Sequence, residues 1–172
     1  PMIRNDLHRL MNEMTRLFNV EYFAFTGASM GGYSSFRMAC NTDRDRFGPV
    51  VASCPAIYVY SWIAGMDTIT AKVQGGWFDD KLVILMHGDA DATVPIAEST
   101  QLYNYAADHT WWEYFQVSGA GHEDFFVRSD VYGETHAGVD GDPAYIWNRV
   151  AAWESAHPES SDGVPLFPES GW

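Results

Sequence analysis

A serine stands between glycines in residues 27–31 (GASMG), directly after the apolar run 22–25 (YFAF). A short run of aromatic and apolar residues predicts a strand, and the small residues after it predict a turn too tight for most side chains. A serine hydroxyl at such a corner can act as a nucleophile when a neighbouring base takes its proton. Ser29 is therefore a candidate nucleophile.

An acidic loop follows the most apolar run of the chain. Residues 82–86 (LVILM) predict a buried strand, and residues 87–95 (HGDADATVP) come directly after it. A carboxylate in this loop could orient a catalytic histidine and stabilise its protonated form. Asp91 is the candidate, and the alternative is Asp89, which could instead cap the following turn.

A histidine follows the last predicted strand. Residues 111–117 alternate aromatic and polar side chains, and the glycine-containing segment 119–122 (GAGH) ends on His122. An imidazole is the usual base that activates a serine hydroxyl. Three other histidines could be considered for this role: His87 at a strand end, where structural hydrogen bonds are expected, His109 at a helix end and His136 in an acidic loop.

The elements that must position these residues follow from the spacing of apolar side chains. Recurrence every three or four positions predicts helices, and continuous apolar runs predict buried strands. The predicted helices are 3–18, 30–40, 95–106 and 143–156, and the predicted strands are 22–25, 50–54, 82–86 and 111–117. Their alternation predicts an α/β fold with a mostly parallel sheet, helices on both faces and active residues at the carboxyl ends of the strands.

One globular unit is expected from the length of 172 residues. Residues 1–157 are expected to form the catalytic core. Within it, residues 57–78 mix aromatic residues and glycines with a short amphipathic piece, so we expect an excursion that shapes a pocket. Residues 158–172 are rich in proline, serine and glutamate, without a period, and predict a surface tail.

Charge and composition exclude several classes of partner. The chain has 23 acidic and 10 basic residues, a formal net charge of −13. Such a surface repels phosphate backbones and anionic lipids, so we expect no nucleic-acid or membrane partner. The sequence shows no apolar run long enough to span a membrane and no pattern of a signal peptide. We therefore expect a soluble protein, secreted or cytoplasmic. Cys40 and Cys54 could form a disulfide or remain two buried thiols.

Taken together, the three segments resemble the α/β-hydrolase superfamily. The G-x-S-x-G-G elbow, the H-G-x-x-D-x-x-V-P segment and the GAGH loop look like those of its esterases and prolyl-oligopeptidase-type peptidases, and they occur in the same order. The resemblance implies Ser29 as the nucleophile and His122 as the general base and acid. It implies Asp91 as the orienting acid, because the family's acid stands three residues before Val-Pro. The backbone N–H of Met30 would match one donor of the oxyanion hole.

The sequence departs from the superfamily ahead of the elbow. In the superfamily several strands and the loop with the second oxyanion donor precede the nucleophile, whereas the predicted strand 22–25 stands near the start of this sequence. We therefore expect a truncated α/β-hydrolase fold that lacks the N-terminal strands. The missing N-terminal part of its own catalytic domain is the candidate partner.

The expected function is a serine hydrolase that cleaves carboxylic esters through an acyl-enzyme intermediate, with no metal or organic cofactor. The substrate would be a small-molecule ester or a peptide. The alternatives are a prolyl-oligopeptidase-like serine peptidase and a non-catalytic binding module with the same fold. Trp62 and Trp77, within residues 57–78, could line the substrate pocket, and a structural role is the alternative for each.

Overall fold

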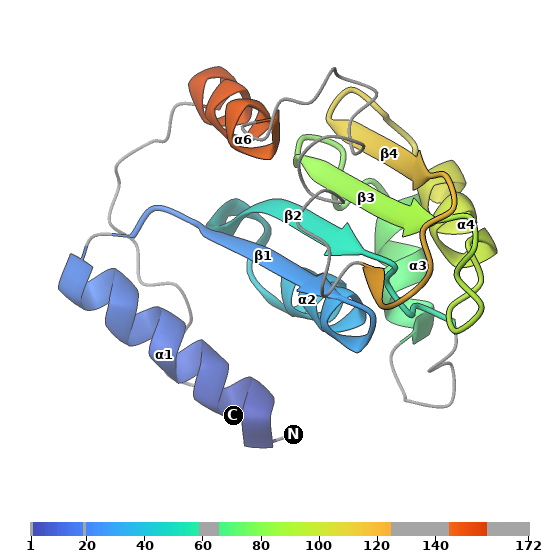
Figure 1. Cartoon of the computed structure of the whole chain (residues 1–172). Helices are drawn as coiled ribbons and strands as arrows, with labels where there is room; N and C mark the ends of the chain where they lie inside the picture. Colours follow the sequence, from blue (N-terminus) through green and yellow to red (C-terminus); the bar gives the residue numbers. More distant parts are fainter. Residues whose placement is uncertain (1, 19, 59–65, 125–144, 158–172) are drawn as a thin grey trace.

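The computed structural model describes residues 2–18, 20–58, 66–124 and 145–157 (Figure 1). The predicted helices and strands are present in the predicted order with shifts of a few residues at their ends, and the structure adds a 3-10 turn at 44–46 and a helix at 66–74. The described elements are α1 (Met2–Phe18), β1 (Phe23–Ala28), α2 (Met30–Asn41), the 3-10 turn η1 (Arg44–Arg46), β2 (Phe47–Ser53), α3 (Met66–Gln74), β3 (Val83–Gly88), α4 (Ala97–Tyr105), β4 (Trp112–Val117) and α6 (Tyr145–Ala156).

The four described strands form one parallel sheet in the order β1-β2-β3-β4. Each strand lies beside its sequence neighbour, and Ala28 pairs with Ser53, which in turn pairs with Met86. Gly88, the last residue of β3, pairs with Val117, the last residue of β4. The carboxyl ends of all four strands therefore meet at one edge of the sheet, as the sequence predicted.

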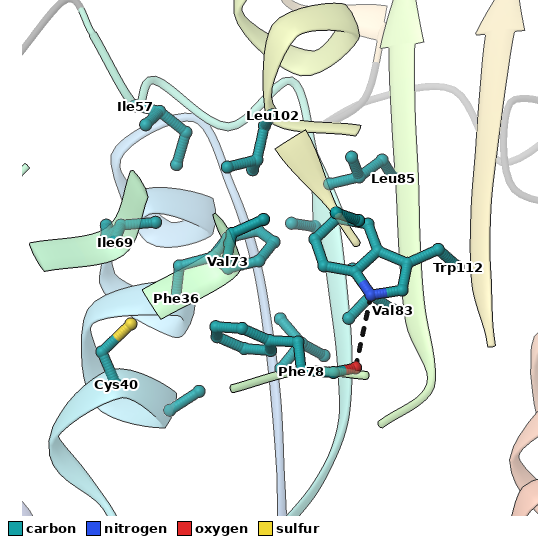
Figure 2. Packing of buried hydrophobic residues seen from close by; sticks show 14 of the residues in the cluster. Phe36, Cys40, Ile57, Ile69, Val73, Phe78, Val83, Leu85, Leu102 and Trp112 are labelled. Atoms are coloured by element: carbon teal, nitrogen blue, oxygen red, sulfur yellow. Dashed lines mark hydrogen bonds between the residues drawn. The ribbon is translucent and has the colours of Figure 1, made fainter. Parts of the chain in front are cut away.

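Helices cover both faces of the sheet, and each face has its own apolar cluster. Phe36 of α2 packs against Phe78 and Trp112, with ring centroids 5.6 and 6.4 Å apart, in the cluster beneath α2, α3 and α4 (Figure 2). Trp153 of α6 belongs to the cluster on the other face. Because β2 and β3 lie between the two clusters, both their faces must be apolar, which explains the continuous runs in their sequences.

The outer edge of β1 is less covered than its sequence suggests. All six residues of β3 are buried, whereas no residue of β1 is fully buried. Beside β1 runs α1, on which Leu10 and Phe18 are 56% and 66% exposed. A wholly apolar groove of about 330 Å³ separates the two elements and is lined by Leu7, Leu10, Met11, Met14, Phe23, Phe25 and Met38. β1 thus has the sequence of an interior strand at an edge position.

The structure also bears on the predictions for the two cysteines, for membrane insertion and for the segments 57–78 and 158–172. Cys40 and Cys54 are both buried and both free. None of the described helices is long and apolar enough to cross a bilayer. Of the expected pocket-shaping segment, residues 59–65 lie outside the described residues, and Ile69 and Val73 of α3 are buried in the core beneath the sheet. The expected tail at 158–172 also lies outside the described part of the chain.

Phe36 provides a test of this packing. Phe36→Ala should lower the free energy of unfolding by about 4 kcal/mol, because a fully buried phenyl ring leaves a cavity between α2 and the sheet. Ser34→Ala, on the exposed side of the same helix, should change it by less than about 0.5 kcal/mol. Urea unfolding of both variants measures the difference, and equal effects would contradict the packing described here.

Candidate active site

Ser29 occupies a strained turn between β1 and α2. Its backbone has φ 55° and ψ −120°, a conformation that residues with a side chain rarely adopt. Hydrogen bonds on both sides hold the turn: Ser29 N–H donates to the Ser53 carbonyl at 2.9 Å, and the Ser29 carbonyl accepts from Tyr33 N–H at 3.1 Å and Ala56 N–H at 3.2 Å. The neighbouring ends of β1, β2 and α2 therefore maintain the strain.

Two glycines permit the close approach of α2 to the strands. A Cβ atom on Gly27 would lie 2.5 Å from the backbone of Gly31, and one on Gly32 would lie 2.9 Å from Pro55. A Cβ on Gly31 would meet nothing within 4 Å, although Gly31 is the second glycine of the G-x-S-x-G pattern. The glycines required for packing in this turn are thus Gly27 and Gly32.

The loop after β3 folds around the Asp91 carboxylate. Its Oδ1 atom accepts from the backbone N–H groups of Thr93 and Val94, both at 2.8 Å. Asp91 therefore caps the turn, a role that the sequence had suggested for Asp89. The Asp89 carboxylate instead accepts from Gly119 N–H at 2.6 Å and ties this loop to the loop that carries His122.

The His122 loop is held against the acidic loop by backbone contacts. Ala90 N–H donates to the Ala120 carbonyl at 3.1 Å, and a Cβ on Gly88 would overlap that same oxygen. Gly121 N–H donates to the Asp124 carboxylate at 2.7 Å. These contacts fix the backbone on both sides of His122.

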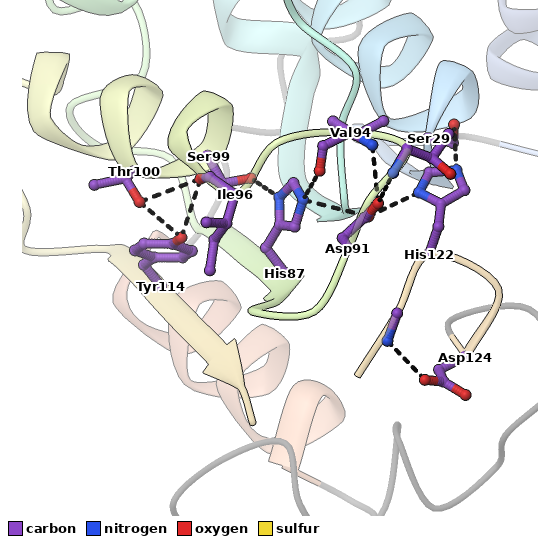
Figure 3. A network of polar contacts seen from close by, with 12 residues as sticks. Ser29, His87, Asp91, Val94, Ile96, Ser99, Thr100, Tyr114, His122 and Asp124 are labelled. Atoms are coloured by element: carbon purple, nitrogen blue, oxygen red, sulfur yellow. Dashed lines mark hydrogen bonds and ion pairs between the residues drawn. The ribbon is translucent and has the colours of Figure 1, made fainter. Parts of the chain in front are cut away.

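The structure brings Ser29, Asp91 and His122 into one hydrogen-bonded chain (Figure 3). His122 Nε2 lies 2.9 Å from Ser29 Oγ, and His122 Nδ1 lies 2.8 Å from Asp91 Oδ2. The Asp91 side chain is wholly buried, and that of His122 is 14% exposed. Burial alone would raise the pKa of Asp91, but the N–H groups of Val94 and Thr93 and the imidazole outweigh it and lower that pKa.

A second histidine lies behind Asp91. The buried His87 ring contacts Ser99 Oγ through Nδ1 at 2.7 Å and the Val94 carbonyl through Nε2 at 2.9 Å. Its Nε2 is also 3.4 Å from Asp91 Oδ2. Burial lowers the pKa of His87, and the Val94 carbonyl and Asp91 oppose this only in part, so the ring is neutral at neutral pH. The structural hydrogen bonds expected for His87 are therefore present.

Comparison with known proteins identifies the fold. No protein-family profile and no curated protein matches the chain. Among solved structures, the esterase domain of a Rhodothermus marinus protein matches with TM-score 0.59 and 15% identity, over 89% of this chain and 68% of that one. A Paleococcus ferrophilus monoacylglycerol lipase matches with TM-score 0.53 and 17% identity, over 88% of this chain and 74% of the lipase. The chain has an α/β-hydrolase fold.

This α/β-hydrolase fold is truncated relative to similar structures. A predicted CIB-like hydrolase from Thermoplasma acidophilum matches with TM-score 0.51 and 20% identity, over 73% of this chain. The match covers 53% of the Thermoplasma protein, so the chain spans about half of its length. Four parallel strands are present among the described residues.

Cys54 is a neighbour of the Ser29, Asp91 and His122 side chains that sequence reasoning did not place there. It follows β2 directly, so the same argument from strand ends could have found it. Its Sγ, a carboxylate oxygen of Asp91 and a ring nitrogen of His122 lie within 4.8 Å of one another. These are ligand types that zinc accepts. However, burial raises the pKa of the Cys54 thiol to about 12, and the other two groups already bind each other, which opposes a metal site.

The remaining predicted site residues lie in different places. Met30 is the first residue of α2, where N–H groups have no acceptor within the helix and the helix dipole is positive. Trp77 lies at the opposite end of the sheet from Ser29, stacked on Phe47, and donates to the Ala39 carbonyl. Trp77 therefore packs at the start of β2, and the suggestion that it lines the substrate pocket is corrected. Two predicted candidates, Trp62 and His136, lie outside the described residues, and His109 is exposed and stacked on Tyr103.

Relief of the strain at Ser29 should be measurable. Ser29→Gly should be about 1 kcal/mol more stable than Ser29→Ala, because glycine adopts φ 55° without steric cost and alanine does not. Both variants lack the hydroxyl, so the comparison isolates the backbone. Chemical unfolding of the two variants measures it, and an alanine variant as stable as the glycine variant would exclude strain at this turn.

The lowered pKa of Asp91 predicts a pH-dependent stability. The ionised carboxylate stabilises the folded state fully above the usual pKa of 3.8, and this contribution disappears as the pH falls through the lower pKa of the folded protein. Below pH 3.8 the wild-type free energy of unfolding should therefore fall more steeply than that of Asp91→Asn. The exposed Asp45→Asn should retain the wild-type slope. Parallel curves for wild type and Asp91→Asn would contradict the assignment.

Proposed function

We propose that the protein is a serine hydrolase that cleaves carboxylic esters through an acyl-enzyme intermediate. The observation that carries the proposal is the continuous chain from Ser29 Oγ to His122 Nε2, at 2.9 Å, and from His122 Nδ1 to Asp91 Oδ2, at 2.8 Å. Because a carboxylate can only accept, Nδ1 carries the proton and Nε2 is the acceptor. This tautomer is the one that can take a proton from a serine hydroxyl.

In the acylation step Ser29 Oγ forms a bond to the ester carbonyl carbon while His122 Nε2 takes the hydroxyl proton. The adjacent Asp91 carboxylate stabilises the imidazolium that forms. The carbonyl oxygen becomes an oxyanion, for which Met30 N–H at the start of α2 is the proposed donor. His122 then gives its proton to the alcohol oxygen as the bond between carbonyl carbon and alcohol oxygen breaks.

Deacylation repeats these transfers with water. His122 removes a proton from a water molecule, whose oxygen attacks the acyl carbon, and the same proton then returns to Ser29 Oγ as the acid leaves. A hydrolase of this kind uses two oxyanion donors, and the loss of one in a serine protease costs about 100- to 1000-fold in turnover. We propose that the second donor comes from the part of the polypeptide that precedes the elbow in larger relatives.

The ester substrate is supported by two of the similar structures, which are named as an esterase domain and a monoacylglycerol lipase. A peptidase would use the same three side chains, and a binding module would use none of them. The preference for an ester over an amide is therefore part of the proposal, and the test below includes both substrates.

The test is labelling with a fluorophosphonate, which forms a bond only with an activated serine. The wild-type chain should gain one adduct, detected by intact mass, and Ser29→Ala should gain none. His122→Ala should label at least about 100-fold more slowly, because general-base assistance contributes 10²–10⁴. Ser34→Ala is the matched control: its exposed hydroxyl donates to the Met30 carbonyl and should not affect the labelling rate.

Substrate preference is measured with the same protein. A p-nitrophenyl ester of a short acid should be hydrolysed faster than a p-nitroanilide of a short peptide, and Ser29→Ala should abolish both activities. Labelling or ester turnover that survives Ser29→Ala would exclude the proposed function. Absence of labelling even in a protein that supplies the second oxyanion donor would exclude it as well. Faster cleavage of the anilide would instead favour the peptidase.

A further inference from the structure

His87 links the three elements that surround Asp91. It lies in β3, contacts Ser99 in α4 and contacts the Val94 carbonyl in the acidic loop. The N–H of the same Val94 donates to Asp91 Oδ1. Val94 therefore holds one carboxylate oxygen of Asp91 through its N–H and contacts the His87 ring through its carbonyl. The other carboxylate oxygen lies 3.4 Å from the same Nε2 atom (Figure 3).

The hydrogen bonds determine the tautomer of His87. A carbonyl oxygen can only accept, so Nε2 must carry the proton, and in a neutral ring Nδ1 must then accept from the Ser99 hydroxyl. The ionisable groups that face the ring are Asp91 and His122, and the facing polar group on α4 is Ser99. The positive end of the Nε2–H bond thus lies between the Val94 carbonyl and the Asp91 carboxylate.

We infer that His87 is a positioning residue, which fixes the orientation and the ionised form of Asp91 through its Nε2–H group and so maintains the Asp91–His122 pair. Ser99 holds the imidazole in the required tautomer. His87 itself touches no reacting atom. The inference rests on the proposed function for its kinetic consequence, while its structural consequence can be measured without catalysis.

Two substitutions of His87 test whether the ring acts as a hydrogen-bond donor or only fills space. The amide nitrogen of glutamine can occupy the place of Nε2, whereas asparagine reaches only the place of Nδ1. His87→Asn should lower the fluorophosphonate labelling rate at neutral pH about tenfold, because a misplaced catalytic group loses rate. It should also move the acid limb of the pH–rate profile to higher pH, since protonation of the Asp91–His122 pair is no longer opposed by the Nε2–H dipole. His87→Gln should restore both properties in large part.

A spectroscopic measurement tests the same inference without activity. The proton shared by His122 Nδ1 and the Asp91 carboxylate should give a downfield proton resonance in NMR, assigned by its loss in His122→Ala. This resonance should move or broaden in His87→Asn and should remain close to the wild-type position in His87→Gln. Ser99→Ala, which removes only the partner of Nδ1, should produce a smaller change in the same direction and serves if His87→Asn does not fold.

The outcomes distinguish the two proposals. An unchanged resonance and acid limb in folded His87→Asn, or glutamine and asparagine variants that behave alike, would overturn the positioning role. Labelling that survives Ser29→Ala would overturn the proposed function, and the resonance would still test whether His87 orients Asp91.

Discussion

The site depends on one buried, ionised carboxylate. The side chain of Asp91 is wholly buried, and an unpaired carboxylate in that position would cost several kcal/mol. It is stable because donors converge on it from separate parts of the chain: two N–H groups of its own loop and the His122 ring, with the His87 ring beside it. The acidic loop, the end of β3 and the loop after β4 must therefore all be in place before Asp91 can be ionised. This requirement links folding of the three segments to the chemistry proposed for them.

The turn at Ser29 shows a second link between packing and chemistry. Its unfavourable backbone conformation is maintained by hydrogen bonds to Ser53, Tyr33 and Ala56, and the close approach of α2 requires Gly27 and Gly32 to lack side chains. In the proposed reaction, the same arrangement would aim the N-terminus of α2 at the position where negative charge develops on the substrate. The strained turn lowers the stability of this part of the fold, and it places the Ser29 hydroxyl against the His122 ring.

In the described part of the chain, the two outer strands of the sheet, β1 and β4, differ in character. β4 carries Glu113 and Gln116, polar residues of the kind that limit unwanted pairing at an edge. β1 has the sequence of a strand covered on both faces, yet its only described strand neighbour is β2, and the apolar side chains of α1 stand beside it partly exposed. This asymmetry agrees with a truncated α/β-hydrolase fold, and it places the less protected surface along β1 and α1.

The sequence by itself determined the order of the predicted strands and the loops that carry the candidate residues, because Ser29, Asp91 and His122 each follow an apolar run and parallel strands end at one edge of a sheet. Local patterns could not show which way each loop side chain points. Only the tertiary structure assigned the turn cap to Asp91 and placed His87 behind it. It also put Trp77 at the far end of the sheet. The physical reason is that these contacts join residues distant in sequence, and strand register and loop packing bring them together only in the folded chain.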